Sequence, residues 1–188
     1  MEIDKKIFEI EFRGVLNEGD FMALQRKLVK EAASYEEDDK ISYFFVVKGF
    51  VLKITDEISK NGSYITLKIG HETGSDFEEI DIAIPRSSVI DSLKLFNLLG
   101  YKQVNKVPQK RSNYFLNDSV IASLKITPDF GYHFEVETAA NGYAEIESKK
   151  AELLGICRKY GLSPLSNEQM AAKIEEINLN HNFNQYGD

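Results

Sequence analysis

The sequence predicts an α+β protein built on a closed antiparallel β-barrel, or tunnel, of about eight strands with helices packed outside. Short segments alternate apolar and polar residues, and compact turns join most of them in sequence, as in antiparallel hairpins. A sheet of about eight or nine such strands curls, and closure removes its exposed edges. Helical periodicity in four other segments predicts the outer helices.

The first half of the chain is expected to contain five strands and a helix. A polar cap at residues 17–20 leads into an amphipathic helix at residues 21–35. The acidic run at residues 36–39 is typical of a solvated loop. Lys48-Gly49 and Asn61-Gly62 are hairpin turn signals. The strands are expected at residues 7–13, 41–47, 50–56, 64–69 and 77–84, with a polar loop at residues 71–76.

The second half repeats this plan. A helix at residues 89–99 ends at Gly100, and a helix at residues 143–159 ends at Gly161. The β-like segments between them are expected at residues 101–107, 111–116, 120–126 and 132–138. A last helix is expected at residues 167–177. The length suits one domain, residues 1–180, followed by a polar tail at residues 181–188.

Composition restricts the partners of the protein. The formal net charge of −7 argues against non-specific binding to nucleic acid or to an anionic membrane. A phosphorylated small molecule remains compatible, provided that a local cationic pocket or divalent metal ions receive it. No apolar run is long enough to span a membrane, and the first six residues lack the apolar core of a signal peptide. The single cysteine, Cys157, permits no internal disulfide and favours a cytoplasmic location.

Charged residues gather on one face of the predicted strands. In the first strand, Glu9, Glu11 and Arg13 share a face because side chains alternate along a strand, and Phe8 and Ile10 lie on the opposite face. The same parity recurs in later strands. The shared faces hold six carboxylates (Glu9, Glu11, Glu79, Asp81, Glu135, Glu137) and five cationic groups (Arg13, Lys53, Lys68, Arg111, Lys125).

Two interpretations of this parity stay open. An antiparallel sheet with one face in water would carry such charges as ordinary surface groups. A closed barrel would instead bring them into a tunnel, where an unpaired buried charge is costly. In that case the excess of carboxylates implies divalent cations, Mg²⁺ or Mn²⁺, because oxygen ligands select them. The cations on the opposite wall imply a polyanion, and a polyphosphate would satisfy both groups.

An ordered set of five segments resembles a known family. They are Glu9-Ile10-Glu11-Phe12-Arg13, Ile65-Thr66-Leu67-Lys68, Phe77-Glu78-Glu79-Ile80-Asp81, Gln109-Lys110-Arg111-Ser112-Asn113-Tyr114 and Gly131-Tyr132-His133-Phe134-Glu135-Val136-Glu137. They resemble the Glu-x-Glu-x-Lys, Leu-Thr-x-Lys, Arg-x-Glu-x-Glu, Lys-x-Arg-x-x-Tyr and Gly-x-Phe-x-Glu-x-Glu patterns of the CYTH, or triphosphate tunnel metalloenzyme, superfamily. That superfamily includes class IV adenylate cyclases and thiamine, inorganic and RNA triphosphatases. The resemblance covers about residues 7 to 178 and makes the predicted domain CYTH-like.

The resemblance implies roles for these residues. Metal ligands would come from the carboxylates Glu9, Glu11, Glu135, Glu137, Glu79 and Asp81, holding one or two Mg²⁺ or Mn²⁺ ions. The triphosphate would be bound by Arg13, Lys53, Lys68, Arg111 and Lys125. The residues expected to serve catalysis are Glu9, Glu11, Arg111 and Lys125. A small-molecule triphosphate is then the expected substrate: attack by water makes a triphosphatase, and attack by the ribose hydroxyl of ATP makes a cyclase.

Two departures from the family pattern keep alternatives open. The family has Arg-x-Arg where this chain has Lys53-Ile54-Thr55, and it has an acidic residue where this chain has Lys125. The first change replaces two phosphate-binding forks with one point charge. A binding module that holds nucleotide or polyphosphate without turnover is therefore the alternative to an enzyme, and a structural barrel is the third hypothesis. A homodimer would fit the cyclase branch of the family.

Overall fold

The structure is a computed structural model that describes residues 6–70 and 75–180. The predicted tail at residues 181–188 lies outside the described residues, as does most of the predicted loop at residues 71–76. The strands are β1 (Ile7–Val15), β2 (Ser34–Glu37), β3 (Lys40–Phe45), β4 (Phe50–Glu57), β5 (Gly62–Ile69), β6 (Asp76–Ala83), β7 (Val104–Phe115), β8 (Ile121–Thr127) and β9 (Gly131–Asn141). The helices are α1 (Glu18–Glu31), α2 (Val89–Leu98), α3 (Ile146–Tyr160) and α4 (Asn167–Asn180), with single 3₁₀ turns before α2 and α3.

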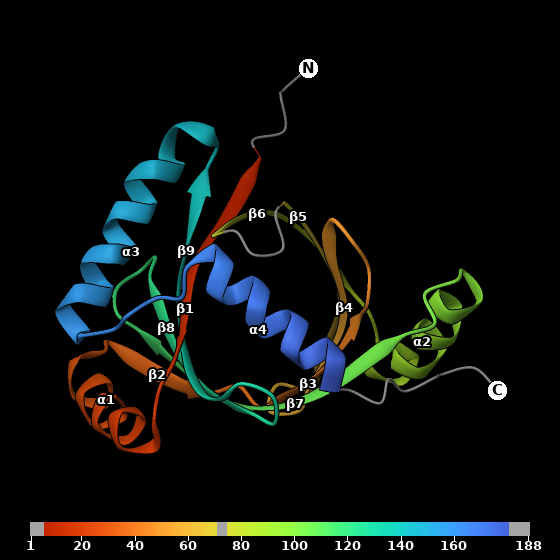
Figure 1. Cartoon of the computed structure of the whole chain (residues 1–188), viewed down its shortest axis with the longest axis horizontal. Coiled ribbons are helices and arrows are strands. Elements are labelled where there is room, and N and C mark those ends of the chain that lie inside the picture. Colours follow the sequence, from red (N-terminus) through yellow and green to blue (C-terminus); the bar gives the residue numbers. More distant parts are fainter. Residues whose placement is uncertain (1–5, 71–74, 181–188) are drawn as a thin grey trace.

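Eight antiparallel strands close into a barrel, which confirms the predicted fold class. The order β7-β3-β4-β5-β6-β1-β9-β8 returns to β7 through a β7–β8 pairing, and the ninth strand, β2, pairs with β7 outside this ring. Figure 1 shows the barrel nearly end on. Because alternate side chains of every strand face inward, closure of the barrel turns the charged faces of the strands toward one shared interior.

Helices cover the apolar outer face of the barrel in two places (Figure 1). α1 and α3 bury a cluster against β1, β8 and β9 that includes Ile10, Leu28 and Leu153. α2 buries a second cluster against β3 and β4, built around Ile54 and Leu93. These well-packed apolar clusters stabilise the strands whose other faces form the polar interior.

α4 lies across one mouth of the barrel (Figure 1). The segment that leads into it is tied to β1, because the Leu165 N–H donates to the Arg13 carbonyl at 2.8 Å. Gly14 permits this close approach: a Cβ there would lie 2.6 Å from the Ser163 carbonyl oxygen and from the Phe134 ring. Within residues 6–70 and 75–180, no helix combines the length and hydrophobicity that a membrane crossing requires.

Three local expectations were wrong. The predicted helix at residues 21–35 ends at Glu31, and part of the predicted loop at residues 36–39 belongs to strand β2. The two segments predicted at residues 101–107 and 111–116 form one strand, β7. Pro108 does not interrupt β7, because β8 pairs with β7 only from Lys110 onward, so no ladder bond is lost on that side.

Candidate active site

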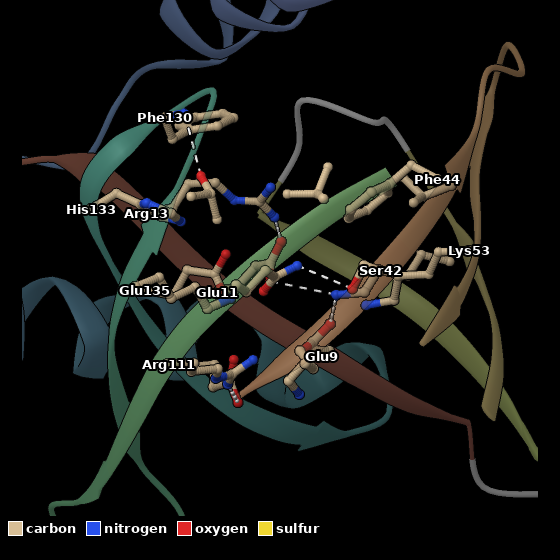
Figure 2. Close-up of a pocket in the computed structure, with 18 of the residues that line it drawn as sticks. Glu9, Glu11, Arg13, Ser42, Phe44, Lys53, Arg111, Phe130, His133 and Glu135 are labelled. Atoms are coloured by element: carbon tan, nitrogen blue, oxygen red, sulfur yellow. Dashed lines mark hydrogen bonds and ion pairs between the residues drawn. The ribbon is translucent and has the colours of Figure 1, made fainter. Parts of the chain in front are cut away.

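The barrel interior encloses a cavity of about 630 Å³ lined mainly by charged and polar side chains. Side chains from strands on every side of the barrel turn into it (Figure 2). It is lined by all the residues predicted as site residues: Glu9, Glu11, Arg13, Lys53, Lys68, Glu79, Asp81, Arg111, Lys125, Glu135 and Glu137. Their common lining of one cavity supports the tunnel interpretation of the parity over the solvated sheet.

Three carboxylates form the tightest acidic group. The β1–β9 register places Glu11 directly opposite Glu137, and Glu9 lies two residues earlier on the same face of β1. One oxygen from each of Glu9, Glu11 and Glu137 lies within 4.8 Å of the others, although like charges repel. This carboxylate triad fits a hard divalent cation such as Mg²⁺ or Mn²⁺, which takes oxygen ligands.

A single ammonium group, that of Lys68, lies among three carboxylates. It pairs with Glu9, approaches Glu11 at 3.4 Å and approaches Glu79 at 3.3 Å. Burial alone would raise the pKa of Glu9, but the charge of Lys68 lowers it to about 2. Burial, together with a hydrogen bond to Glu9, raises the pKa of Glu79 to about 8. Burial therefore favours the protonated form of Glu79 in the metal-free protein.

Arg111 is fixed on both ends of its guanidinium group. Nε donates to Asn113 Oδ1 at 2.6 Å, and Nη2 donates to Ser123 Oγ at 2.9 Å and to Glu137 at 3.3 Å. Its Nε also lies 3.5 Å from Asp38 Oδ2. A planar fork held in this way is suited to binding phosphate oxygens, and it lies beside a member of the carboxylate triad.

Lys125 and Glu135 form an ion pair across β8 and β9. Burial lowers the pKa of Lys125 to about 7, and the charge of Arg111 acts in the same direction. Burial opposes the ionisation of Glu135, yet the charges of Lys125 and Arg13 hold its pKa well below its usual range. Glu135 is thus engaged by a lysine, whereas the resemblance assigned it to a metal.

Lys53 differs from the other cations of the wall. It lines the cavity, and within the described part of the chain its ammonium has no hydrogen bond or ion pair. Burial lowers its pKa to about 8, and the charge of Lys68 adds to the effect. A cation placed in this way is ready to receive an anion.

The remaining predicted residues have ordinary contacts. Arg13 pairs with Glu11 on the same strand. Asp81 accepts a hydrogen bond from Thr66 Oγ1 at 2.6 Å and is exposed. His133 approaches the Gly131 carbonyl at 3.0 Å through Nδ1, as a wall residue would. Tyr114 belongs to the outer core and Cys157 is buried, so both have packing roles.

Several cavity residues were not predicted from the sequence. They include Asp38, Lys40, Tyr64 and Gln109. The parity test would have found Lys40 if the third strand had been started one residue earlier, because Lys40 and Ser42 alternate with Ile41 and Tyr43. Asp38 gave no such signal, because it lies in a run of four acidic residues that resembles a surface loop.

The comparisons with known proteins agree with this geometry. The sequence matches the CYTH domain over residues 8–171. No curated protein matches it.

Solved structures share the fold. The PH1819 protein of Pyrococcus horikoshii OT3 is 20% identical with a TM-score of 0.71, covering 88% of this chain and 99% of its own. A candidate adenylate cyclase from Vibrio parahaemolyticus is 16% identical with a TM-score of 0.63, covering 88% and 98%. A candidate adenylyl cyclase from Hippeastrum, described as having a dominant triphosphatase activity, is 17% identical with a TM-score of 0.56, covering 84% and 89%.

Proposed function

The chain belongs to the CYTH domain family, as its motifs predicted, and we propose that it is a metal-dependent enzyme that hydrolyses a triphosphate-containing substrate inside the barrel. One observation carries the proposal: the carboxylate triad and the cationic side chains of Lys53, Lys68 and Arg111 line the same cavity. A divalent cation would neutralise the carboxylates, and a polyphosphate would neutralise the cationic side chains.

The carboxylates Glu9, Glu11 and Glu137 would hold the metal ion, either Mg²⁺ or Mn²⁺. When bound, that ion supplies positive charge to the phosphate oxygens and to the attacking oxygen. Glu135 stands apart from this set because Lys125 already neutralises it.

The cationic residues bind and orient the triphosphate. Arg111 offers a rigid fork, and Lys53 offers a point charge with no partner among the described residues. In hydrolysis, a water oxygen bonds to the terminal phosphorus and releases a proton to solvent, the anhydride P–O bond breaks, and its electron pair leaves with the diphosphate. Both the positioning and the fixed charges favour this step, because phosphoryl transfer needs little else from a protein. The triphosphatase activity described for the Hippeastrum neighbour also supports hydrolysis.

Binding without turnover is the second candidate. The Lys125–Glu135 pair favours it, because it removes one carboxylate from the set that a metal could use. Under this alternative the cavity still takes metal and triphosphate, but no phosphate is released.

The test measures phosphate and pyrophosphate release from ATP, thiamine triphosphate and tripolyphosphate, with Mg²⁺ or Mn²⁺. We expect metal-dependent phosphate release that is lost in Glu11→Gln and kept in Glu78→Gln, whose carboxylate pairs with Lys6 away from the cavity. Pyrophosphate release with a cyclic product from ATP would show a cyclase instead. Metal-dependent binding with no release of either product would support a binding module without turnover and would contradict the proposed enzyme.

A further inference from the structure

β2 and β3 pair with β7 along one line, with a break between them. Glu37 lies opposite Ser112 and Lys40 lies opposite Gln109, so the register is unchanged across the break. The two residues of the break, Asp38 and Asp39, therefore face Arg111 and its neighbour on β7. Two residues of the acidic run that resembled a solvated loop, Glu36 and Asp38, therefore line the cavity.

Asp38 and Asp39, the two residues of the break, hold the backbone of Arg111 by hydrogen bonds. The Asp38 N–H donates to the Arg111 carbonyl at 2.8 Å, and the Arg111 N–H donates to Asp39 Oδ1 at 3.0 Å. Asp39 is itself anchored to the turn between β4 and β5: its N–H donates to Ser59 Oγ at 2.9 Å, and its carbonyl accepts from the Ile58 N–H at 2.8 Å. The position of Arg111 along the wall is thus fixed from outside β7.

The side chain of Asp38 holds the charged end of Arg111 as well. Asp38 is only 2% exposed. Its Oδ2 lies 2.9 Å from Lys40 Nζ and 3.5 Å from Arg111 Nε, and it accepts from Asn113 Nδ2 at 3.0 Å. Burial alone would raise the pKa of Asp38, but the charges of Lys40 and Arg111 outweigh it and lower that pKa. One carboxylate therefore keeps together two cations on neighbouring strands that would otherwise repel.

We propose that Asp38 is a positioning residue that orients Arg111 and Lys40 toward the bound polyphosphate. The chain of contacts runs from Asp38 to Arg111 Nε and from Arg111 Nη2 to Glu137, a member of the carboxylate triad. Asp38 itself contacts neither the triad nor Lys53 among the described residues. The proposal rests on the proposed function, because it assigns the purpose of the arrangement to phosphate binding.

Asp38 could instead only stabilise the barrel. Replacing one member of a buried ion cluster leaves another charge uncompensated, so some loss of stability is expected in either case. The substitution Asp38→Asn keeps the shape and the hydrogen bond from Asn113 while removing the charge. Glu36→Gln is the matched control, because Glu36 contacts Asn113 at 3.2 Å and Lys60 at 2.7 Å in the same cluster but is not in contact with Arg111.

The first measurement needs no substrate. The ¹⁵N NMR signal of the Arg111 Nε–H group is assigned by its disappearance in Arg111→Lys. We expect its hydrogen exchange to accelerate at least about tenfold in Asp38→Asn, because the Asp38 charge that holds the guanidinium against its acceptor, Asn113 Oδ1, is lost, and to stay unchanged in Glu36→Gln. An unchanged signal in folded Asp38→Asn would overturn the proposal.

The second measurement is the Kd for tripolyphosphate with Mn²⁺, in the wild-type and Arg111→Lys backgrounds. We expect Asp38→Asn to weaken binding about tenfold in the wild type and less than about twofold beside Arg111→Lys, because a positioning residue acts through its partner. Equal losses in both backgrounds, or no loss in either, would overturn the positioning role. Absence of any wild-type binding, with the NMR result as expected, would overturn the proposed function while supporting the anchoring of Arg111 by Asp38.

Discussion

The two sides of the cavity wall differ in how their charged side chains are paired. On one side, the Lys68 cluster places one ammonium among the three carboxylates Glu9, Glu11 and Glu79. On the other side, the Arg111 cluster spreads its ion pairs over several residues: Lys40 and Arg111 both contact Asp38, Arg111 also contacts Glu137, and Lys125 pairs with Glu135. The Arg111 cluster distributes its ion pairs and is extensively hydrogen-bonded. In the Lys68 cluster three carboxylates share one lysine, and among the described residues Glu11 alone pairs with a second cation, Arg13.

This difference indicates where each ligand acts. The carboxylates of the Lys68 cluster outnumber the two cations that pair with them, and burial counters this excess by raising the pKa of Glu79 to about 8, which favours its protonated form. A divalent cation on the neighbouring triad would do the same more effectively. The Arg111 cluster is already held by ion pairs and hydrogen bonds, so its geometry is arranged for phosphate before phosphate binds. Under the proposed function, the acidic side is the site that changes when metal binds, and the cationic side is the rigid template for phosphate.

The largest expected effect comes from Glu11→Gln, which removes a charge from the triad. Turnover should fall by about a thousandfold or more, because metal binding and phosphate charge neutralisation are lost together. In the wild type, a metal ion at 100 times its Kd should also add about 2.7 kcal/mol to the free energy of unfolding. Thermal unfolding with and without Mn²⁺ should show this shift in the wild type and in Glu78→Gln, but not in Glu11→Gln. An equal metal-induced shift of thermal unfolding in Glu11→Gln would contradict the assignment of the metal ion to the carboxylate triad.

Lys53→Met tests the cation that has no partner among the described residues. Tripolyphosphate affinity should fall about tenfold, because one charge–phosphate contact is lost. The unfolding midpoint should rise at the same time, because a half-buried ammonium with no ion pair among the described residues is replaced by an apolar chain of similar size. Binding and unfolding are measured beside Lys106→Met, whose lysine lies over the Tyr43 ring outside the cavity. A lower midpoint for Lys53→Met would show that Lys53 has a stabilising partner.

Glu79→Gln tests the proton held by the Lys68 cluster. The folded-state pKa of about 8 exceeds the ordinary 4.5, so the folded metal-free protein binds a proton that the unfolded chain releases between these values. Stability from this group is therefore complete below pH 4.5 and is lost as pH rises toward 8, by at most about 1.4 kcal/mol per pH unit. Urea unfolding at pH 5 to 8 with a chelator, conditions chosen to fall within this window, should show that slope flattened in Glu79→Gln. The same slope in both proteins would place the proton elsewhere.

The smallest effect is expected for Asp81→Asn. Asp81 is exposed and accepts its hydrogen bond from Thr66, apart from the triad. Its replacement should change Mn²⁺ affinity by less than about twofold and stability by less than about 0.5 kcal/mol. Titration of Mn²⁺ into this variant measures the first quantity directly. A large loss would return Asp81 to the metal site that the sequence assigned to it.

Strand parity explains why the cavity residues could be predicted. Alternation fixes the face of Glu9 and Glu11 from the sequence alone, and closure of the barrel turns that face inward. The opposition of Glu11 to Glu137 could not be predicted in this way, because it depends on the register between two strands more than a hundred residues apart.

The cluster at Asp38 was missed for a related reason. Acidic residues on both parities from Glu36 to Asp39 hide the strand signal. Burial of Asp38 comes from the pairing of β2 and β3 with β7, which no local pattern encodes. The engagement of Glu135 by Lys125 likewise follows from the β8–β9 pairing.

The most direct test of the account is a calorimetric titration of tripolyphosphate with and without Mn²⁺, in the wild type and in Glu11→Gln. If the acidic side loads metal and the cationic side holds phosphate, Mn²⁺ should tighten wild-type binding at least about tenfold, a coupling of about 1.4 kcal/mol. Glu11→Gln should bind tripolyphosphate without any response to Mn²⁺. Wild-type binding that is independent of Mn²⁺, or a response that survives in Glu11→Gln, would contradict the account.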